Sequence, residues 1–285
     1  MKVAQSEISR PKISVIVLGH PITSHPATSI ITETLYSIRL IKGVEVESII
    51  VSHDGIRMFA GLGMRKKYKL YLENLENGLK HIDFESKTFK VIKRKFRGHL
   101  NGNIRSALQH VETEFILVVQ QDFPFVREVE LKSLINLMRQ NPRIRHLRFN
   151  KNENKRRGWD AGNEERQLFF RELGTTPQVI QTLAWSDENH LTRKSYYQQV
   201  VFPILGKIRT FPESILNQLS SAETHELFGT YVVGGMGDGP MIRHLDGSLS
   251  DLQKKGFAKR WNILKRRFMW SFYFRWGKLR LWFMN

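Results

Sequence analysis

An acidic side chain stands directly after the most apolar short run of the chain. Residues 115–119 (Phe-Ile-Leu-Val-Val) are followed by two glutamines and then by Asp122. Continuous apolar runs of this length suit a strand that is buried on both faces, as in parallel sheets. Ligands of open α/β sheets bind at the carboxyl ends of the strands, where Asp122 could meet a metal or a phosphate. Asp is also a common residue in a plain turn.

His20 and Asp54 stand in equivalent positions. Each comes just after a run that predicts a strand, at residues 12–18 and 46–51. Because the carboxyl ends of parallel strands meet at one edge of a sheet, we expect His20, Asp54 and Asp122 to lie near one another. Asp54 precedes Gly55, so a turn-forming role explains this residue equally well.

The elements that must position these residues alternate between strand and helix. The patterns predict strands at 12–18, 46–51, 89–93 and 115–119, separated by helices at 28–41, 64–79 and 102–111. This order predicts an α/β fold with a mostly parallel central sheet flanked by helices. Further along, we expect a helix at 128–139, a strand at 146–150, a helix at 188–200 and a Gly-rich loop at 234–239. The simplest division is one domain over residues 1–250 and a tail over 251–285.

Composition narrows the classes of protein to which the chain can belong. Its 285 residues contain no Cys, which excludes disulfides and thiolate metal sites and fits a reducing compartment. Residues 1–12 lack the apolar core of a signal peptide, and no apolar run is long enough to predict a membrane span. The net charge of +18 favours anionic partners: nucleic acid, anionic lipid or phosphorylated substrates.

The tail has a pattern of its own. Residues 254–285 hold ten Lys or Arg and no Asp or Glu, and large apolar residues recur at helical spacing from Phe257 to Phe283. A basic, aromatic, amphipathic helix is typical of segments that lie in an anionic membrane interface. The alternatives are packing against the domain, a dimer contact, or binding of single-stranded nucleic acid.

Four segments in order resemble the GT-A nucleotide-sugar glycosyltransferases, close to family 2. They are residues 13–20 (Ile-Ser-Val-Ile-Val-Leu-Gly-His), 49–55 (Ile-Ile-Val-Ser-His-Asp-Gly), 102–108 (Gly-Asn-Ile-Arg-Ser-Ala-Leu) and 114–123 (Glu-Phe-Ile-Leu-Val-Val-Gln-Gln-Asp-Phe). The resemblance covers residues 12–126 well and 180–247 loosely. It implies a GT-A fold and an inverting transfer of a sugar from a nucleotide donor to a glycan or lipid-linked acceptor.

The resemblance also implies which residues bind the donor. Asp54 would contact the nucleotide base, and His20 would line the same pocket. Asn103, with Arg105 nearby, would face the donor from the start of a helix, where a diphosphate is favoured. As an alternative, Asn103 is a helix N-cap, and both roles can hold together.

A divalent cation is the cofactor that the resemblance implies. The family's Asp-x-Asp element corresponds to residues 120–122, where Gln120 replaces the first Asp and Asp122 keeps the second. His244 matches a C-terminal His that completes the metal site in some members, and Arg243 beside it could pair with phosphate. Mn²⁺ or Mg²⁺ suits oxygen ligands of this kind, although Gln120 is a weaker ligand than Asp.

The general base is expected in the segment Trp185-Ser186-Asp187-Glu188. The resemblance favours Asp187, with Glu188 as the alternative, to take the proton of the acceptor hydroxyl. Acids after a Ser are also ordinary helix N-terminal chemistry. Trp185 could stack on an acceptor sugar or belong to the core.

We therefore expect a metal-assisted glycosyltransferase bound peripherally, through residues 254–285, to the cytoplasmic face of an anionic membrane. Two rival classes remain. One is a protein of the same fold that binds a nucleotide or glycan without turnover. The replacement of the first Asp of the Asp-x-Asp element by Gln120 suggests this class. The other is a nucleic-acid-binding protein, which the lack of a nucleic-acid-binding motif and the concentration of charge in the tail disfavour.

Overall fold

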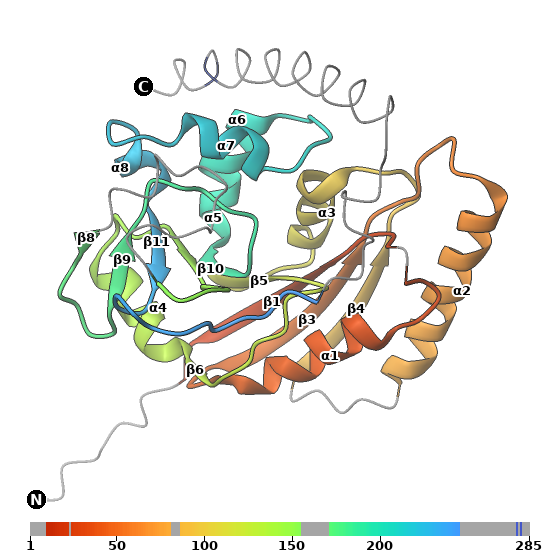
Figure 1. The fold of residues 1–285 in the computed structure, drawn as a ribbon, viewed down its shortest axis with the longest axis horizontal. Coiled ribbons are helices and arrows are strands. Elements are labelled where there is room, and N and C mark those ends of the chain that lie inside the picture. The colour runs from red at the N-terminus through yellow and green to blue at the C-terminus, as the bar shows by residue number, and fades with distance from the viewer. Residues whose placement is uncertain are drawn as a thin grey trace, which may run out of the picture.

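One large mixed sheet forms the centre of the molecule. The computed structural model describes residues 10–22, 24–80, 86–154 and 171–245, together with Lys278 and Arg280. Within these residues nine strands form one sheet in the order β4-β3-β1-β5-β10-β7-β11-β9-β8 (Figure 1). The predicted α/β class is confirmed.

The N-terminal half of the sheet is parallel, as predicted. It consists of β4 (Ser86–Lys93), β3 (Glu45–His53), β1 (Lys12–Gly19) and β5 (Phe115–Gln120), each parallel to its neighbour. In β1 every residue after the first is buried, because helices cover both faces of the sheet. The carboxyl ends of β1, β3 and β5 therefore meet at one edge.

The sheet divides the core into two layers, and helices cover each of them. The core on one face includes residues of α1 (Ser29–Ser37), α2 (Leu62–Leu79) and α4 (Leu131–Gln140), and the core on the other includes residues of α3 (His99–Leu108). The helix predicted to reach residue 41 ends earlier. A 3₁₀ turn, Ile38–Leu40, and a short strand β2 (Ile41–Lys42) follow it, and β2 pairs with β6 (Val129–Glu130).

The C-terminal half of the sheet is mixed. Its strands are β10 (His190–Arg193), β7 (His146–Arg148), β11 (Thr230–Val233), β9 (Val179–Gln181) and β8 (Arg171–Glu172). Short helical segments follow β10: α5 (Lys194–Tyr196), a π-helical turn (Tyr197–Val201), α6 (Phe202–Leu205), α7 (Glu213–Leu219) and α8 (His225–Phe228). Strand β11 is parallel to β7, and the remaining pairings in this half are antiparallel.

The helix predicted over residues 188–200 is wrong in its first part. His190, Leu191 and Thr192 are buried and belong to β10, which runs antiparallel between β5 and β7. Two neighbouring strands satisfy the backbone of β10 on both sides, and helix begins only at Lys194. The acids before His190 resemble a helix start but belong to a loop.

Most of the predicted tail lies outside the described residues. The two exceptions are Lys278 and Arg280, which are helical, and Arg280 Nη1 donates to the carbonyl of Pro203 in α6 at 2.8 Å. Among the residues that are described, no helix combines the length and the apolar character needed to cross a bilayer.

Buried histidines make the stability of the fold depend on pH. Burial lowers the pKa of His53 to about 3 and that of His190 to about 4, whereas an unfolded His titrates near 6.5. Below about pH 6.5 the unfolded chain therefore binds more protons than the native chain, and stability is lost as the pH falls. We expect each of the two to lower the free energy of unfolding by about 2 kcal/mol between pH 7 and about pH 5.

Urea unfolding of His53→Leu and of the wild type at both pH values tests this expectation. The substitution should remove part of the pH dependence, and His110→Leu, which changes an exposed side chain, should not. An unchanged pH dependence in His53→Leu would contradict it.

Candidate active site

Asp122 and His244 lie next to each other at the carboxyl end of β5. Asp122 Oδ2 is 3.4 Å from His244 Nε2, and the imidazole stacks on Phe123 with ring centroids 4.7 Å apart. Backbone hydrogen bonds fix the approach of the two segments: Leu245 N donates to Asp122 O at 2.7 Å and Arg243 N to Pro124 O at 3.0 Å. The two residues expected to share a metal are thus brought together from distant parts of the chain.

The second oxygen of Asp122 is suited to a cation. Asp122 Oδ1 is buried and accepts no hydrogen bond from the described residues, although the side chain as a whole is 14% exposed. A carboxylate and an imidazole are ligands that Mn²⁺ accepts, and oxygens of a bound phosphate or water can fill the other positions. Within the described part of the chain, no three His, Asp or Glu side chains form a metal-binding group, so this pair would need ligands from the substrate.

Gln120 connects the Asp122 loop to the segment of the expected base. Its side-chain Nε2 donates to Asp187 O at 2.7 Å, and its backbone N donates to Asn189 Oδ1 at 2.9 Å. Asn189 in turn donates to Phe123 O at 2.7 Å. Gln120 therefore occupies the position of the missing carboxylate and has a positioning contact that a carboxylate could not make, because Asp has no N–H to donate.

Asp187 pairs with a second acid, Glu213, at the start of α7. Asp187 N donates to Glu213 Oε2 at 2.9 Å, and Glu213 N donates to Asp187 Oδ2 at 3.2 Å. Ser186 Oγ also donates to Glu213 Oε2, at 3.0 Å. Burial raises the pKa of Asp187 well above its usual range, and the nearby Glu213 carboxylate raises it further. Asp187 Oδ1 is buried and has no hydrogen-bond partner among the described atoms.

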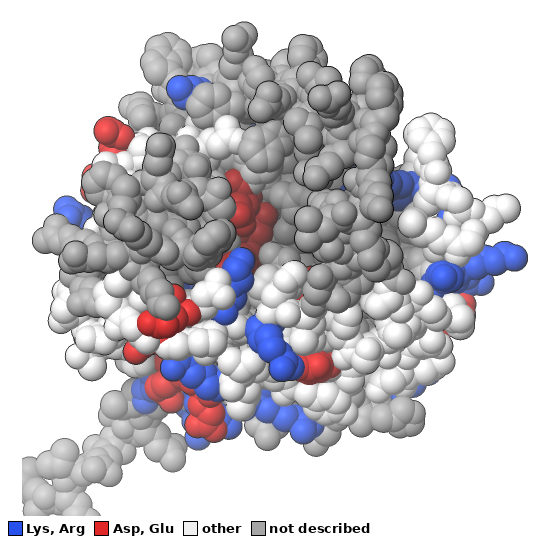
Figure 2. All heavy atoms as spheres, viewed as in Figure 1, with Lys and Arg blue, Asp and Glu red and all other residues white. Residues whose placement is uncertain are grey.

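Glu188, the alternative base, has a different environment. Its Oε1 is paired with Lys151 Nζ, and the side chain is 7% exposed. The Glu188 carboxylate is therefore already engaged by a cation. The space-filling view shows acidic side chains within a hollow near the centre of one face, with a basic side chain beside them (Figure 2).

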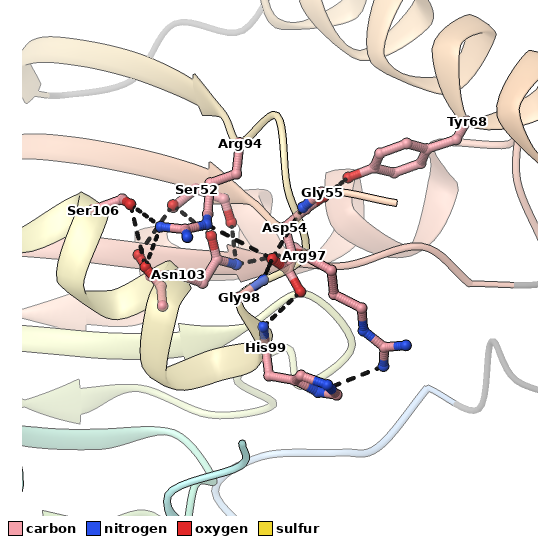
Figure 3. Close-up of polar contacts among 12 residues, drawn as sticks. Ser52, Asp54, Gly55, Tyr68, Arg94, Arg97, Gly98, His99, Asn103 and Ser106 are labelled. Atoms are coloured by element: carbon pink, nitrogen blue, oxygen red, sulfur yellow. Dashed lines mark hydrogen bonds and ion pairs between the residues drawn. The ribbon is translucent and has the colours of Figure 1, made fainter. Parts of the chain in front are cut away.

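Asp54 is held inside the protein by backbone N–H groups (Figure 3). Its Oδ1 accepts from Gly98 N at 2.7 Å and Gly55 N at 3.0 Å, and its Oδ2 accepts from His99 N at 2.9 Å. Burial raises its pKa, and these hydrogen bonds oppose that effect. The carboxylate thus fixes the loop before α3, a role that the expected contact with a nucleotide base does not include.

We expect Asp54→Ala to destabilise the protein by about 3 kcal/mol, because three backbone donors lose a charged acceptor. Urea unfolding measures the loss, and amide hydrogen exchange should accelerate at Gly98 and His99. Glu112→Ala removes an exposed carboxylate and should change neither property. Native exchange rates at Gly98 and His99 in Asp54→Ala would contradict this assignment.

Asn103 and Arg105 on α3 are structural in this conformation. Asn103 is fully buried; its Nδ2 donates to Gly19 O at 2.9 Å and Ser52 O at 2.8 Å, and its Oδ1 accepts from Ser52 Oγ at 2.7 Å. It is not the N-cap either, since α3 begins at His99. Arg105 donates to Gly206 O at 2.6 Å and lies over the Phe202 ring, so its guanidinium is used at the end of α6.

Trp185 and Arg243 make contacts that their expected roles do not include. Trp185 is completely buried and its Nε1 donates to Tyr196 Oη at 3.0 Å, which leaves no surface for stacking on a sugar. Arg243 is exposed and paired with Glu33 of α1 at 2.6 Å. That ion pair joins the His244 segment to α1.

Histidine and arginine side chains lie at the same sheet edge. Burial is the main cause that lowers the pKa of His20, with the charge of Arg97 adding to it, and Asp122 and Asp54 are close enough to oppose the shift. The expected gathering of His20, Asp54 and Asp122 is therefore present. His99 has a pKa lowered to about 4 by burial and then by Arg97, among other cations.

His99 has an unusual backbone conformation. Its φ of 54° lies in the left-handed region, which costs a non-Gly residue roughly 1–2 kcal/mol. The hydrogen bond from His99 N to Asp54 holds it there. Backbone strain of this kind is frequent where a binding site is preorganised.

Sequence reasoning missed Glu213, Arg97 and His99. Glu213 follows Pro212, which signals only a helix start, and nothing in its spacing points to Asp187. Arg97 and His99 follow the third predicted strand, so their position after a strand was a usable signal.

No protein-family model matches the chain, and no curated protein matches it. Solved structures do match. GalNAc-T7 with UDP, GalNAc and Mn²⁺ is 13% identical, with a TM-score of 0.51 over 85% of this chain and 46% of that chain. S. aureus TarS in complex with UDP-GlcNAc is 14% identical, with a TM-score of 0.48 over 86% and 62%. A mannosyltransferase from Pyrobaculum calidifontis in complex with GDP-Man and Mn²⁺ is 12% identical, with a TM-score of 0.45 over 82% and 57%.

The similarity to GalNAc-T7 identifies the fold. The chain spans less than two thirds of the length of each of those proteins. The GalNAc-T7 match, together with the parallel β4-β3-β1-β5 arrangement, confirms the predicted GT-A fold of nucleotide-sugar glycosyltransferases.

Proposed function

We propose that this chain is an inverting glycosyltransferase that moves a sugar from a nucleoside-diphosphate sugar to a hydroxyl group of a glycan or lipid-linked acceptor. The observation that carries the proposal is the pairing of Asp122 with His244, joined through Gln120 to the buried Asp187. A cation-binding pair and a basic carboxylate at the same sheet edge supply the two kinds of group that the reaction needs.

On the donor side, Asp122 and His244 would hold Mn²⁺ or Mg²⁺. When bound, the cation would stabilise the negative charge of the departing diphosphate. Arg97 and His20 would line the donor pocket beside this pair, which their electrostatic proximity to Asp54 and Asp122 supports.

On the acceptor side, Asp187 would take the proton of the attacking hydroxyl. The acceptor oxygen forms its bond to the anomeric carbon as the bond from that carbon to the diphosphate breaks, and the nucleoside diphosphate leaves with the electron pair. Glu213 would keep Asp187 basic by like-charge repulsion and would orient it through the reciprocal hydrogen bonds. The contact of Glu188 with Lys151 favours Asp187 over Glu188 as the base.

The proposal also includes the domain organisation and the membrane location of the protein. Residues 1–250 would form the catalytic domain, and residues 251–285 would bind an anionic membrane surface on its cytoplasmic side. The basic composition of the tail supports this arrangement. No nucleic-acid partner is proposed.

A protein that binds nucleotide sugar without turnover is the second candidate. One ground is that the Gln120 side chain is used in a hydrogen bond to the backbone of Asp187. The other is that, within the described residues, no third metal-ligating side chain lies near Asp122 and His244. In that case Asp187 would be a buried acid that takes no proton from an acceptor.

Donor binding and donor turnover separate these possibilities. We expect a UDP-sugar or GDP-sugar, with Mn²⁺, to raise the unfolding temperature of the wild type, because a ligand of the native state stabilises it. Asp122→Ala should lose this shift. Release of nucleoside diphosphate would identify an enzyme, and a shift without release would identify a binding protein. No shift and no release with any donor would overturn both.

A further inference from the structure

The loop between β3 and α2, together with the first turn of α2, exposes an unusual set of large apolar side chains. Phe59 is 92% exposed, Leu62 78%, Met58 71% and Met64 54%, and Phe96 in the loop before α3 is 59% exposed. These are the five most exposed of the large hydrophobic residues among those described. Single exposed apolar residues are normal, but a concentration of them marks an interaction site.

The segment before and at the start of α2 neighbours the loop that carries Phe96. A Cβ atom built on Gly55 would meet the backbone of Phe96 at 2.4 Å, so the base of the first loop touches the second. Gly55 thereby permits the close approach of the two backbones. The exposed apolar residues consequently belong to one corner of the molecule.

Hydrogen bonds shape the turn that presents them. Arg65 Nε donates to Ala60 O at 3.0 Å, and its Nη2 contacts Met58 O. Ala60 N donates to Arg57 O at 3.0 Å. The apolar side chains therefore project from a closed turn instead of folding back onto the core.

Cations surround this corner. Residues 57–67 contain Arg57, Arg65, Lys66 and Lys67, all exposed, and no acid. Within the described part of the chain, none of these four cations forms an ion pair with an acid. The acids of α2 lie further along the helix, where Glu73 pairs with Lys69 and Glu76 with Lys93. The positive charge of α2 is thus concentrated at its N-terminal end.

The exposed corner is visible in both views of the molecule. The loop before α2 forms a corner of the ribbon beside that helix (Figure 1), and uncharged side chains project there with Lys and Arg side chains beside them (Figure 2).

We propose that residues 57–67 together with Phe96 form a membrane-contact surface that inserts into the headgroup region of a bilayer containing anionic phospholipid. Apolar side chains that enter the interface, with Lys and Arg at the level of the headgroups, are the two components of interfacial binding. A protein partner usually needs a broad complementary surface of roughly 800 Å² per side, whereas these five side chains come from two short neighbouring segments of the chain. The surface lies on the catalytic fold and is separate from the basic tail.

The absence of Cys from the chain gives a direct test. In the full chain, Phe59→Cys carries a single environment-sensitive fluorophore, and Tyr36→Cys, at another exposed aromatic position, carries the same label as the control. With phosphatidylglycerol vesicles, the label at residue 59 should shift to the blue and be quenched by lipid-borne quenchers. The label at residue 36 should not respond. Because the readout is local, binding of the tail alone cannot produce it.

Substitutions measure the two components. Phe59→Ser with Leu62→Ser should weaken partitioning onto phosphatidylglycerol vesicles about tenfold or more, and Lys66→Gln should weaken it about fivefold. Val126→Ser, which removes an exposed apolar residue elsewhere, should leave it unchanged. The proposal is overturned if the labels at residues 59 and 36 respond alike, or if Phe59→Ser with Leu62→Ser partitions like the wild type. Neither result would bear on sugar transfer, which is measured without vesicles.

Discussion

Asp187→Asn is expected to lower kcat for sugar transfer about 10³-fold while donor affinity stays close to that of the wild type. A positioned general base contributes roughly 10² to 10⁴ in rate, and an amide cannot take the proton. Asn retains an oxygen that can accept the hydrogen bond from Glu213 N, so the local backbone should persist. Steady-state kinetics together with a donor titration monitored by calorimetry would measure both quantities.

Glu213→Gln supplies the matched test of how Asp187 is tuned. The substitution removes the negative charge that raises the pKa of Asp187 but keeps an oxygen acceptor for Ser186 and Asp187. Because the base must be deprotonated, activity rises with pH through its pKa, and a lower pKa moves that rise to lower pH. Glu226→Gln, at an exposed acid on α8, should leave the profile in place.

Two results would count against this role of the pair. Full transfer activity in Asp187→Asn would remove Asp187 as the base and return attention to Glu188. A profile for Glu213→Gln that coincides with that of the wild type would show that Glu213 does not set the basicity of Asp187, even if Asp187 itself is essential.

The second large effect is expected at the cation pair. Asp122→Ala should reduce kcat/KM about 10³-fold. A bound metal ion stabilises the charge that develops on the leaving diphosphate by several kcal/mol, and this stabilisation would be lost. His244→Ala should cost less, about 10- to 100-fold, because the imidazole is half-exposed and water can replace it as a ligand. Donor kinetics measured across a Mn²⁺ titration would report both the loss and any change in metal affinity.

A double substitution tests whether the two residues act on one ion. If Asp122 and His244 bind the same cation, the loss in Asp122→Ala with His244→Ala should be smaller than the product of the single losses. His110→Ala, at an exposed His elsewhere, is the control. An Asp122→Ala variant with native Mn²⁺ dependence would exclude Asp122 from the metal site.

The parallel half of the fold was predictable because its strands carry a strong local signal. Runs such as 115–119 are continuously apolar and can be satisfied only by burial on both faces. Strand β10 gave no such signal, since His190, Thr192 and Arg193 are polar and only its two partner strands make it extended. Tertiary pairing overrode the helical pattern there.

The candidate site shows the same division between local and tertiary information. The positions of His20, Asp54 and Asp122 follow from strand ends, and the chain brings them to one edge. The direction of a side chain does not follow from its position. Asp54 is turned toward Gly98 and His99, and Asn103 toward Ser52. Which partner an amide or carboxylate chooses depends on backbone groups supplied by other segments.

The pairing of Asp122 with His244 has a consequence for the order of events during synthesis. The ribosome delivers the chain from its N-terminus, and domains begin to fold as they emerge. Strand β11 ends at Val233, so every strand of the described sheet is made before His244. The proposed cation pair is therefore completed last, after the scaffold that holds Asp122 is already available. Under the proposed function, a nascent chain would become able to bind a donor only after residue 244 has been translated.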